Sequence, residues 1–284
     1  MKENIMVDEL GKEIAIEAAK AVAVEGYKDA LQPTFKAAGS IFALPFQAID
    51  AALSKPKLWV AEKCYNYERT RQLLAQKMKY TPEDEIVPPE NYVAVPALQQ
   101  IAYCFDSDEL RDMYANLLAN SMNKVVKNGV HPGFVDIIKQ LSPDEAKILK
   151  YISVHITIPT ITLRYENDDG GGINIITDFS NVGEICGCEN PIDITKYFDN
   201  LARLGLITRA GTLSTLCDET QYNPLINHKW IMSYATTEKA NARGFEKYNF
   251  SKSYIKLNAY GKSFCSICLE PPTTIILKSQ ESGN

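Results

Sequence analysis

The chain has 284 residues, of which 45% are hydrophobic and 23% are charged, and its formal net charge is −5. This length is enough for two modest domains, each with its own core, while the acidic balance argues against the basic patch on which most nucleic-acid-binding proteins depend. The acidic N-terminus lacks the apolar core of a secretory signal, no stretch reaches the roughly eighteen apolar residues of a spanning helix, and an odd number of cysteines, seven, predicts free thiols in a reducing cytoplasm.

Residues 1–90 are predicted to form an N-terminal helical region. Helical periodicity covers residues 5–31, an uncharged segment follows at 37–49, and a predicted helix at 54–79 then carries seven basic and two acidic residues. The uncharged segment is either a buried turn where small residues let helices pack closely, or a contact with an anionic membrane surface. The membrane interpretation assigns contacts to Ile41, Phe42, Leu44, Phe46, Trp59, Arg69 and Arg71.

A proline-rich connection at residues 81–89 leads into a compact helical core, predicted at residues 91–141. Asp106 and Glu109 have the spacing of a capping box for a helix from Ser107 to Met122. His131-Pro132 is predicted to open the next helix, and Ser142-Pro143 a third, because serine caps helices and proline suits the first turn. The helix at 107–122 has one apolar stripe, formed by Leu110, Met113, Tyr114, Leu117, Leu118 and Met122.

Three polar residues, Asn116, Asn120 and Ser121, are interleaved with this apolar stripe. Such residues gain little in a helix interior. Two interpretations follow: they cross-link neighbouring helices, or they form a surface of the core that contacts a partner. The sequence leaves both open.

The motifs of this core resemble those of the abortive-infection alpha (Abi-alpha) family of bacterial proteins. The matching pieces are Pro96-Ala97-Leu98, Asp108–Arg111, Ala115–Met122, His131-Pro132, Phe134-Val135, Ile137–Leu141 and Ser142–Ala146. The resemblance covers roughly a fifth of the chain strongly, and the flanks match only in general organisation. It implies a role in phage defence, and it implies no catalytic residues.

Residues 142–270 are predicted to form a C-terminal α+β domain whose element order is typical of a winged helix, and a polar tail follows at 271–284. The domain carries 13 basic and 15 acidic residues. The expected elements are a helix at 143–152, strands at 156–163 and 173–177, helices at 179–186 and 191–204 (the latter stopped by Gly205), a strand at 206–209, an enlarged wing at 210–250, a return strand at 253–257 and a last helix capped by Asn258.

DNA binding is the usual inference from a winged helix, and its candidate contacts here are Lys196, Arg203 and Arg209. Asp193 and Asp199 offset the charge of the helix that would read the bases. Because phosphate neutralisation dominates nucleic-acid affinity, specific nucleic-acid binding is disfavoured and contact with a protein is favoured.

The residues that carry chemistry do not form a recognisable motif. Cys186 and Cys188 are separated by one residue, and Cys265 and Cys268 fall within a predicted helix, so neither pair has the turn spacing of a zinc site. The three histidines, His131, His155 and His228, are scattered, and Gly170–Gly172 precedes a strand rather than the helix N-terminus that binds phosphate. The sequence predicts no catalytic site, no metal and no cofactor.

Taken together, the sequence predicts a mostly α protein: an N-terminal helical region and a helical core, followed by an α+β winged-helix-like C-terminal domain. The predicted function is non-enzymatic phage defence through contact with a protein partner or self-association, with the anionic inner membrane surface as a further contact. The alternative is a winged-helix nucleic-acid-binding regulator. The expected location is cytoplasmic, either free or peripheral at the inner membrane.

Overall fold

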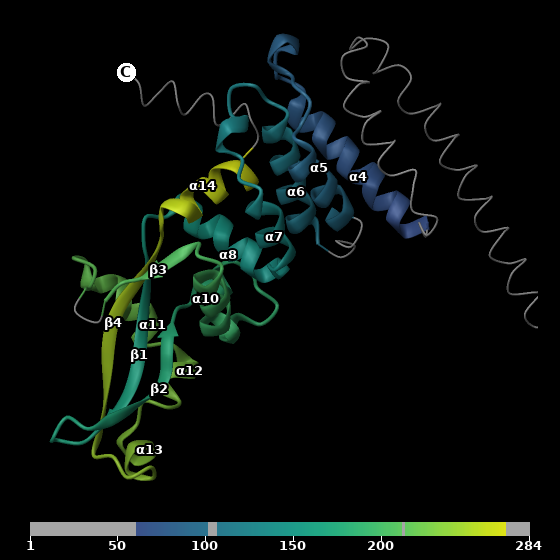
Figure 1. Ribbon diagram of the computed structural model, residues 1–284. Coiled ribbons are helices and arrows are strands. Elements are labelled where there is room, and N and C mark those ends of the chain that lie inside the picture. Colours follow the sequence, from purple (N-terminus) through teal and green to yellow (C-terminus); the bar gives the residue numbers. More distant parts are fainter. Residues whose placement is uncertain (1–60, 102–106, 212–213, 271–284) are drawn as a thin grey trace, which may run out of the picture. The chain divides into compact units, whose positions relative to one another are not determined.

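The computed structural model describes residues 61–101, 107–211 and 214–270 of the chain (Figure 1). It is mostly helical and contains a four-stranded antiparallel sheet with the strand order β2-β1-β4-β3. The chain divides into two units: unit 1 comprises residues 1–139 and 270–284, and unit 2 comprises residues 140–269. The helix predicted at residues 5–31 and the uncharged segment at 37–49 lie outside the described residues.

Unit 1 is built around one central helix. Its elements are α4 (Ala61–Met78), η1 (Glu83–Glu85), α5 (Asn91–Ile101), α6 (Asp108–Ser121), η2 (Lys127–Gly129) and α7 (Gly133–Lys139). α6 contacts α4, α5 and α7, and ten of its fourteen residues are buried. The helix is therefore enclosed on more sides than the single apolar stripe predicted.

The cap of α6 differs from the predicted one by a single position. The Ser107 hydroxyl oxygen accepts a hydrogen bond from the Leu110 amide at 3.1 Å, and the hydroxyl donates to the Glu109 carboxylate at 3.2 Å. The expected cap, Asp106, lies outside the described residues. Aspartate and serine are both good N-caps, so two such residues in a row leave the start of a helix uncertain by one position.

Apart from the region expected to be an enlarged wing, unit 2 follows the element order expected from the sequence. Its elements are α8 (Pro143–Val154), β1 (Ile158–Glu166), β2 (Gly172–Phe179), α9 (Val182–Ile185), η3 (Pro191–Asp193), α10 (Ile194–Arg203), β3 (Ile207–Arg209), η4 (Glu219–Tyr222), α11 (Asn223–Ile226), α12 (Lys229–Met232), α13 (Thr237–Asn241), β4 (Lys247–Leu257) and α14 (Ala259–Cys268). Several expected boundaries are wrong: β1 covers residues 158–166 instead of 156–163, and α9 covers 182–185 instead of 179–186. β4 begins at Lys247 rather than at residue 253, and the region expected to be an enlarged wing holds four short helical elements.

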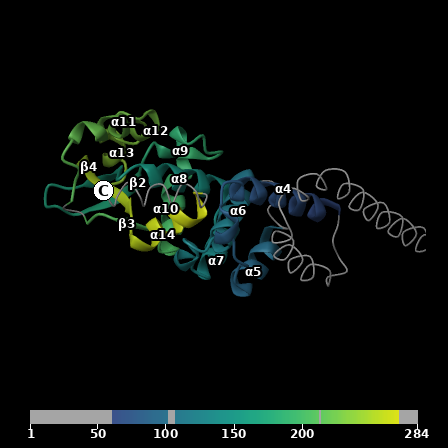
Figure 2. The ribbon, with the colours of Figure 1, turned by 90° about the horizontal axis from the view of Figure 1, so that it is seen from above.

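Helices cover both faces of the sheet in unit 2. Ile158 pairs with Ile255, and Ile207 pairs with Leu257; all four are buried, on the face where α8, α10 and α14 contact the sheet. Since side chains alternate between faces, Leu163 points to the other face, where α11 and α13 contact β1 and β4. Figure 2 shows α11 and α12 on the opposite side of the sheet from α10 and α14.

Two glycines are required where α10 and α14 meet the sheet. Gly205 ends α10 with a φ of 71°, the left-handed conformation of a helix C-terminus, as the sequence predicted. At Gly261 in α14, a Cβ atom would lie 1.9 Å from the Leu206 carbonyl oxygen. Only glycine permits this approach of α14 to the segment that enters β3. The predicted cap of α14 is also confirmed, because the Asn258 side chain accepts from the Gly261 amide at 2.8 Å.

Candidate functional site

The three polar residues of α6 lie in the interior of unit 1. Asn116 and Asn120 have no exposed surface, and Ser121 has 3%. The Asn116 amide donates to Asp112 (3.3 Å), the Ser121 hydroxyl donates to the Leu118 carbonyl (2.7 Å), and the Asn120 amide donates to the Glu270 carbonyl (2.9 Å). Of the two interpretations that the sequence left open, this burial argues against a contact surface of the core and favours the packing interpretation. Asn120 ties α6 to a segment 150 positions away, whereas Asn116 and Ser121 bond within the helix.

Replacing Asn120 by alanine is expected to lower the free energy of unfolding by about 1–3 kcal/mol, because the Glu270 carbonyl loses a buried donor. Denaturant unfolding measures the change, and Asn128→Ala, at an exposed position in η2, is the matched control. Phage protection should be reduced only if the variant is also less stable. Lost protection at unchanged stability would instead restore the contact-surface interpretation.

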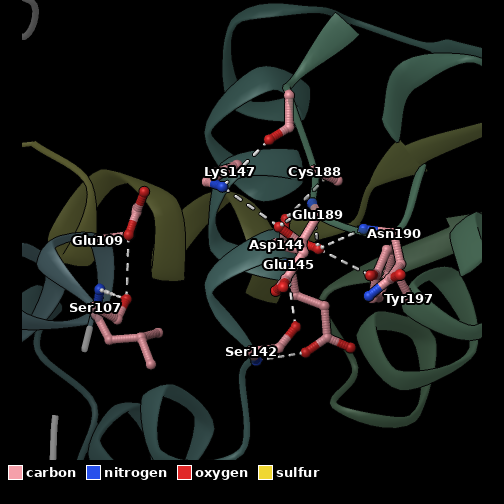
Figure 3. A network of polar contacts seen from close by, with 12 residues as sticks. Ser107, Glu109, Ser142, Asp144, Glu145, Lys147, Cys188, Glu189, Asn190 and Tyr197 are labelled. Carbon is pink, nitrogen blue, oxygen red and sulfur yellow. Dashed lines mark hydrogen bonds and ion pairs between the residues drawn. The ribbon is translucent and has the colours of Figure 1, made fainter. Parts of the chain in front are cut away.

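The most connected carboxylate of unit 2 is that of Asp144, in the first turn of α8 (Figure 3). It accepts hydrogen bonds from the Glu189 amide at 3.0 and 3.1 Å, the Asn190 amide at 3.4 Å and the Tyr197 hydroxyl at 2.9 Å. Lys147 completes the set with an ion pair at 3.4 Å. One buried side chain thus joins α8, the loop after α9, and α10.

The start of α8 is further held by a capping box, also drawn in Figure 3. The Ser142 hydroxyl oxygen accepts from the Glu145 amide at 3.2 Å, and the Glu145 carboxylate accepts from the Ser142 amide at 2.7 Å. The predicted serine cap is confirmed, with Pro143 in the first turn. This box fixes the turn from which Asp144 projects.

The electrostatics of the Asp144 network suit a structural anchor. Burial alone raises the pKa of Asp144, but the hydrogen bonds from Glu189, Tyr197 and Asn190 together hold it below its usual value. Burial and the neighbouring Asp144 carboxylate raise the pKa of Tyr197 far above its usual value. A general acid or base works best with a pKa near the working pH. The pKa of Asp144 is lowered and that of Tyr197 is raised, so both move away from neutral pH.

The helical motif of α6, the His131-Pro132 start of α7 and the Ser142–Glu145 capping box are the parts of the chain that resembled a known family. The family model for abortive infection alpha matches residues 63–268. The chain belongs to this family. The match includes all of α6 and α7 and nearly all of unit 2.

Comparisons with individual proteins add little to this assignment. No curated protein matches the chain. A solved structure of an uncharacterized protein from the marine bacterium Alcanivorax borkumensis SK2 is similar at 18% identity and a TM-score of 0.33. The similarity covers 47% of this chain and 90% of that one.

In this abortive-infection alpha protein, no disulfide joins the cysteines that the structure describes. Burial, followed by the charge of Asp144, raises the pKa of the Cys188 thiol to about 11, and burial also raises that of Cys186. Cys265 and Cys268 are buried in α14. Thiols with raised pKa values are poor nucleophiles, and within the described ranges no three metal-ligating side chains come together.

The histidines are placed separately, each with a local contact. The His131 ring nitrogen accepts from the Gly133 amide at 3.1 Å at the start of α7. His155 ends α8 and stacks on Tyr151 with ring centroids 3.8 Å apart. His228 lies 2.9 Å from the Glu184 carboxylate. Gly170 and Gly171 lie in the β1–β2 turn, where the Gly171 amide donates to Asp169, and Gly172 begins β2.

All three candidate nucleic-acid contacts have partners inside unit 2. Lys196 pairs with Asp193 at 3.2 Å, and the Arg203 guanidinium donates to the Asn200 and Gln140 side chains. Arg209 of β3 bridges Asp178 of β2 at 2.7 Å and Asp199 of α10 at 2.5 Å. Asp178 adopts a φ of 52°, the one positive φ among described residues other than glycine.

The Asp144 network and the Arg209 bridge were not predicted from the sequence. An aspartate after Ser142-Pro143 is expected to stabilise the helix through its dipole. Nothing near Asp144 in the sequence indicates that it binds Glu189 or Tyr197. For Asp178, the available signal is its place at the end of a β-branched run, where aspartate tolerates a left-handed conformation.

Only part of the predicted membrane contact can be placed. Arg69 is exposed on α4, whereas Arg71 is 8% exposed, so its assignment as a surface contact is corrected. The other assigned contacts lie outside the described residues; these are Ile41, Phe42, Leu44, Phe46 and Trp59. In the portion of the chain that is described, no helix has both the length and the apolar character needed to cross a bilayer.

Proposed function

We propose that this protein acts in phage defence as a non-enzymatic binding protein, and that unit 2 contacts a protein partner. Membership of the abortive-infection alpha family supports the biological process. The observation that carries the mechanism is the use of Asp144: the most connected buried carboxylate of unit 2 holds backbone amides and a tyrosine, with its pKa lowered. This carboxylate therefore stabilises the fold of unit 2 and does not have the properties of a catalytic acid or base.

A small exposed apolar surface of unit 2 is the proposed site of contact with the protein partner. Ile185 of α9 is 55% exposed and Ile192 of η3 is 48% exposed, and these two elements contact each other. Apolar side chains at the centre of a polar rim are typical of the core of a protein interface. As part of the same proposal, unit 2 is a winged-helix-like module, a class that serves protein contact as well as nucleic-acid contact.

The test combines two substitutions on this surface, Ile185→Asp and Ile192→Asp. Because both side chains are largely exposed, the melting temperature should stay within a few degrees of the wild type. Protection against phage, measured as plating efficiency, should be lost. Ile173→Asp on β2, where isoleucine is 43% exposed, is the control and should protect normally. Full protection by the double variant would contradict the proposed contact.

Duplex DNA binding by the full chain is expected to be weak and independent of sequence at physiological salt. The reason is that Lys196, Arg203 and Arg209 are engaged with side chains of unit 2, in a domain whose acidic residues outnumber its basic ones. A gel-shift panel of unrelated duplexes measures this. Tight binding to one sequence that resists salt would contradict the expectation.

A further inference from the structure

The loop between α8 and β1 projects two aliphatic side chains into solvent. Val154 is 76% exposed and Ile156 is 91% exposed, the highest values among the large hydrophobic residues that the structure describes. Between them, His155 folds back: its ring stacks on Tyr151, and its Nδ1 atom lies 2.7 Å from the Tyr151 carbonyl. Residues 154–156, which are the last residue of α8 and the two residues after it, are called the α8–β1 tip. Its own contacts hold the backbone and leave both aliphatic side chains uncovered.

The chain segments next to the tip carry only positive charge. Residues 146–165 and 247–269 contain seven lysines and arginines and no aspartate or glutamate. Lys150 lies one helical turn before Val154 and so shares its face of α8. Ile255 of β4 pairs with Ile158 of β1 in antiparallel register. The next residue, Lys256, therefore lies opposite Thr157, the neighbour of Ile156.

Neither of these two lysines has an ion-pair partner among the described residues, unlike several other basic residues of the same segments. Lys147, Lys247 and Lys252 each form an ion pair. Lys150 and Lys256 are exposed and make no ion pair or side-chain hydrogen bond with any described residue. The tip therefore combines two uncovered aliphatic side chains with two uncompensated cations.

We infer that the α8–β1 tip docks unit 2 onto an anionic lipid surface. A bilayer interface accepts both groups at once, since aliphatic side chains enter the acyl boundary while lysines reach the phosphates and carboxylates of the head groups. Protein interfaces are depleted in lysine and take their binding energy mainly from aromatic residues and arginine. Nucleic acid would use the lysines and leave the aliphatic pair in water. The inference is separate from the protein contact proposed above and from the segment at residues 37–49.

The test is flotation of the full chain with vesicles of phosphatidylcholine, with and without phosphatidylserine. The wild type should float only with phosphatidylserine, and less at high salt. Val154→Ser with Ile156→Ser should lower the partition coefficient about tenfold or more, and Lys150→Glu or Lys256→Glu about fivefold or more each. Ile173→Ser and Lys229→Glu, at exposed positions elsewhere in unit 2, are the controls and should float as the wild type does.

A reporter at the tip separates this contact from any other membrane contact of the chain. Ile156→Trp adds an indole at a 91% exposed position, and its emission should shift to the blue on phosphatidylserine vesicles beyond the change seen in the wild type. An unshifted indole, or tip variants that float like the controls, would overturn the inference. The inference would also be overturned if the wild type does not float and the tip variants nevertheless lose phage protection. That result would indicate that the tip contacts a protein. The Ile185→Asp, Ile192→Asp protein should float normally, so the two proposals fail independently.

Discussion

Leu117→Ala is expected to lower the free energy of unfolding by about 2–5 kcal/mol, the cost of a cavity left by a buried leucine. Leu117 has no exposed surface and Leu118 has 1%, in a helix that three other helices contact. The surrounding α4, α5 and α7 restrict collapse around the missing methyl groups, so the upper half of the range is expected. Leu118→Ala should behave similarly.

Thermal and urea unfolding measure this change, with Val125→Ala as the control. Val125 is 54% exposed just beyond the same helix and should change stability by less than about 0.5 kcal/mol. A cost below about 1 kcal/mol at both leucines would show that α6 is not the centre of a packed core.

Asp144→Ala is expected to lower the free energy of unfolding by about 2–4 kcal/mol, since it leaves one buried and two partly buried donors without their acceptor. The donors are the Glu189 and Asn190 amides and the Tyr197 hydroxyl. Glu189→Gln is the matched control, because only the backbone amide of Glu189 takes part and its side chain is exposed. Equal stability of the two variants would contradict the anchoring role.

The same network predicts a pH dependence. The pKa of Asp144 is lowered in the folded chain, so its contribution to stability is present above its unfolded value of about 4 and is lost as pH falls through the lower folded value. The stability difference between the wild type and Asp144→Asn should therefore be largest near neutral pH and shrink in acid. A difference that grows as pH falls would reverse the assigned sign.

Local features of the fold were predictable because their causes lie within a few residues. The Ser142 cap, the Asn258 cap and the glycine stop at Gly205 each depend on neighbours three or four positions away, and all three are present. Outside the region expected to be a wing, the order of helices and strands in unit 2 followed from hydrophobic periodicity in the same way.

Features that join distant segments were not predictable. Asn120 bonds Glu270, Asp144 bonds Tyr197, and Arg209 bridges two aspartates on different elements. Each partner was one of many polar residues in the sequence, and only the packing of α6 and of the sheet selects it. The same reason explains why the sequence left two interpretations of the polar residues of α6 open. Whether a helix is enclosed depends on how many other helices contact it, and this number cannot be read from the sequence of the helix itself.

The proposal that this protein acts in phage defence without catalysis is tested most directly by replacing its histidines and its more accessible cysteines together. A variant with glutamine at His131, His155 and His228 and serine at Cys186 and Cys217 lacks every histidine and the less buried of the described cysteines. Its plating efficiency for phage and its melting temperature should be measured side by side with the wild type, with single replacements tested if the combined variant unfolds. Binding without catalysis predicts full protection from every variant that keeps the wild-type melting temperature. Protection lost by a variant with an unchanged melting temperature would contradict it.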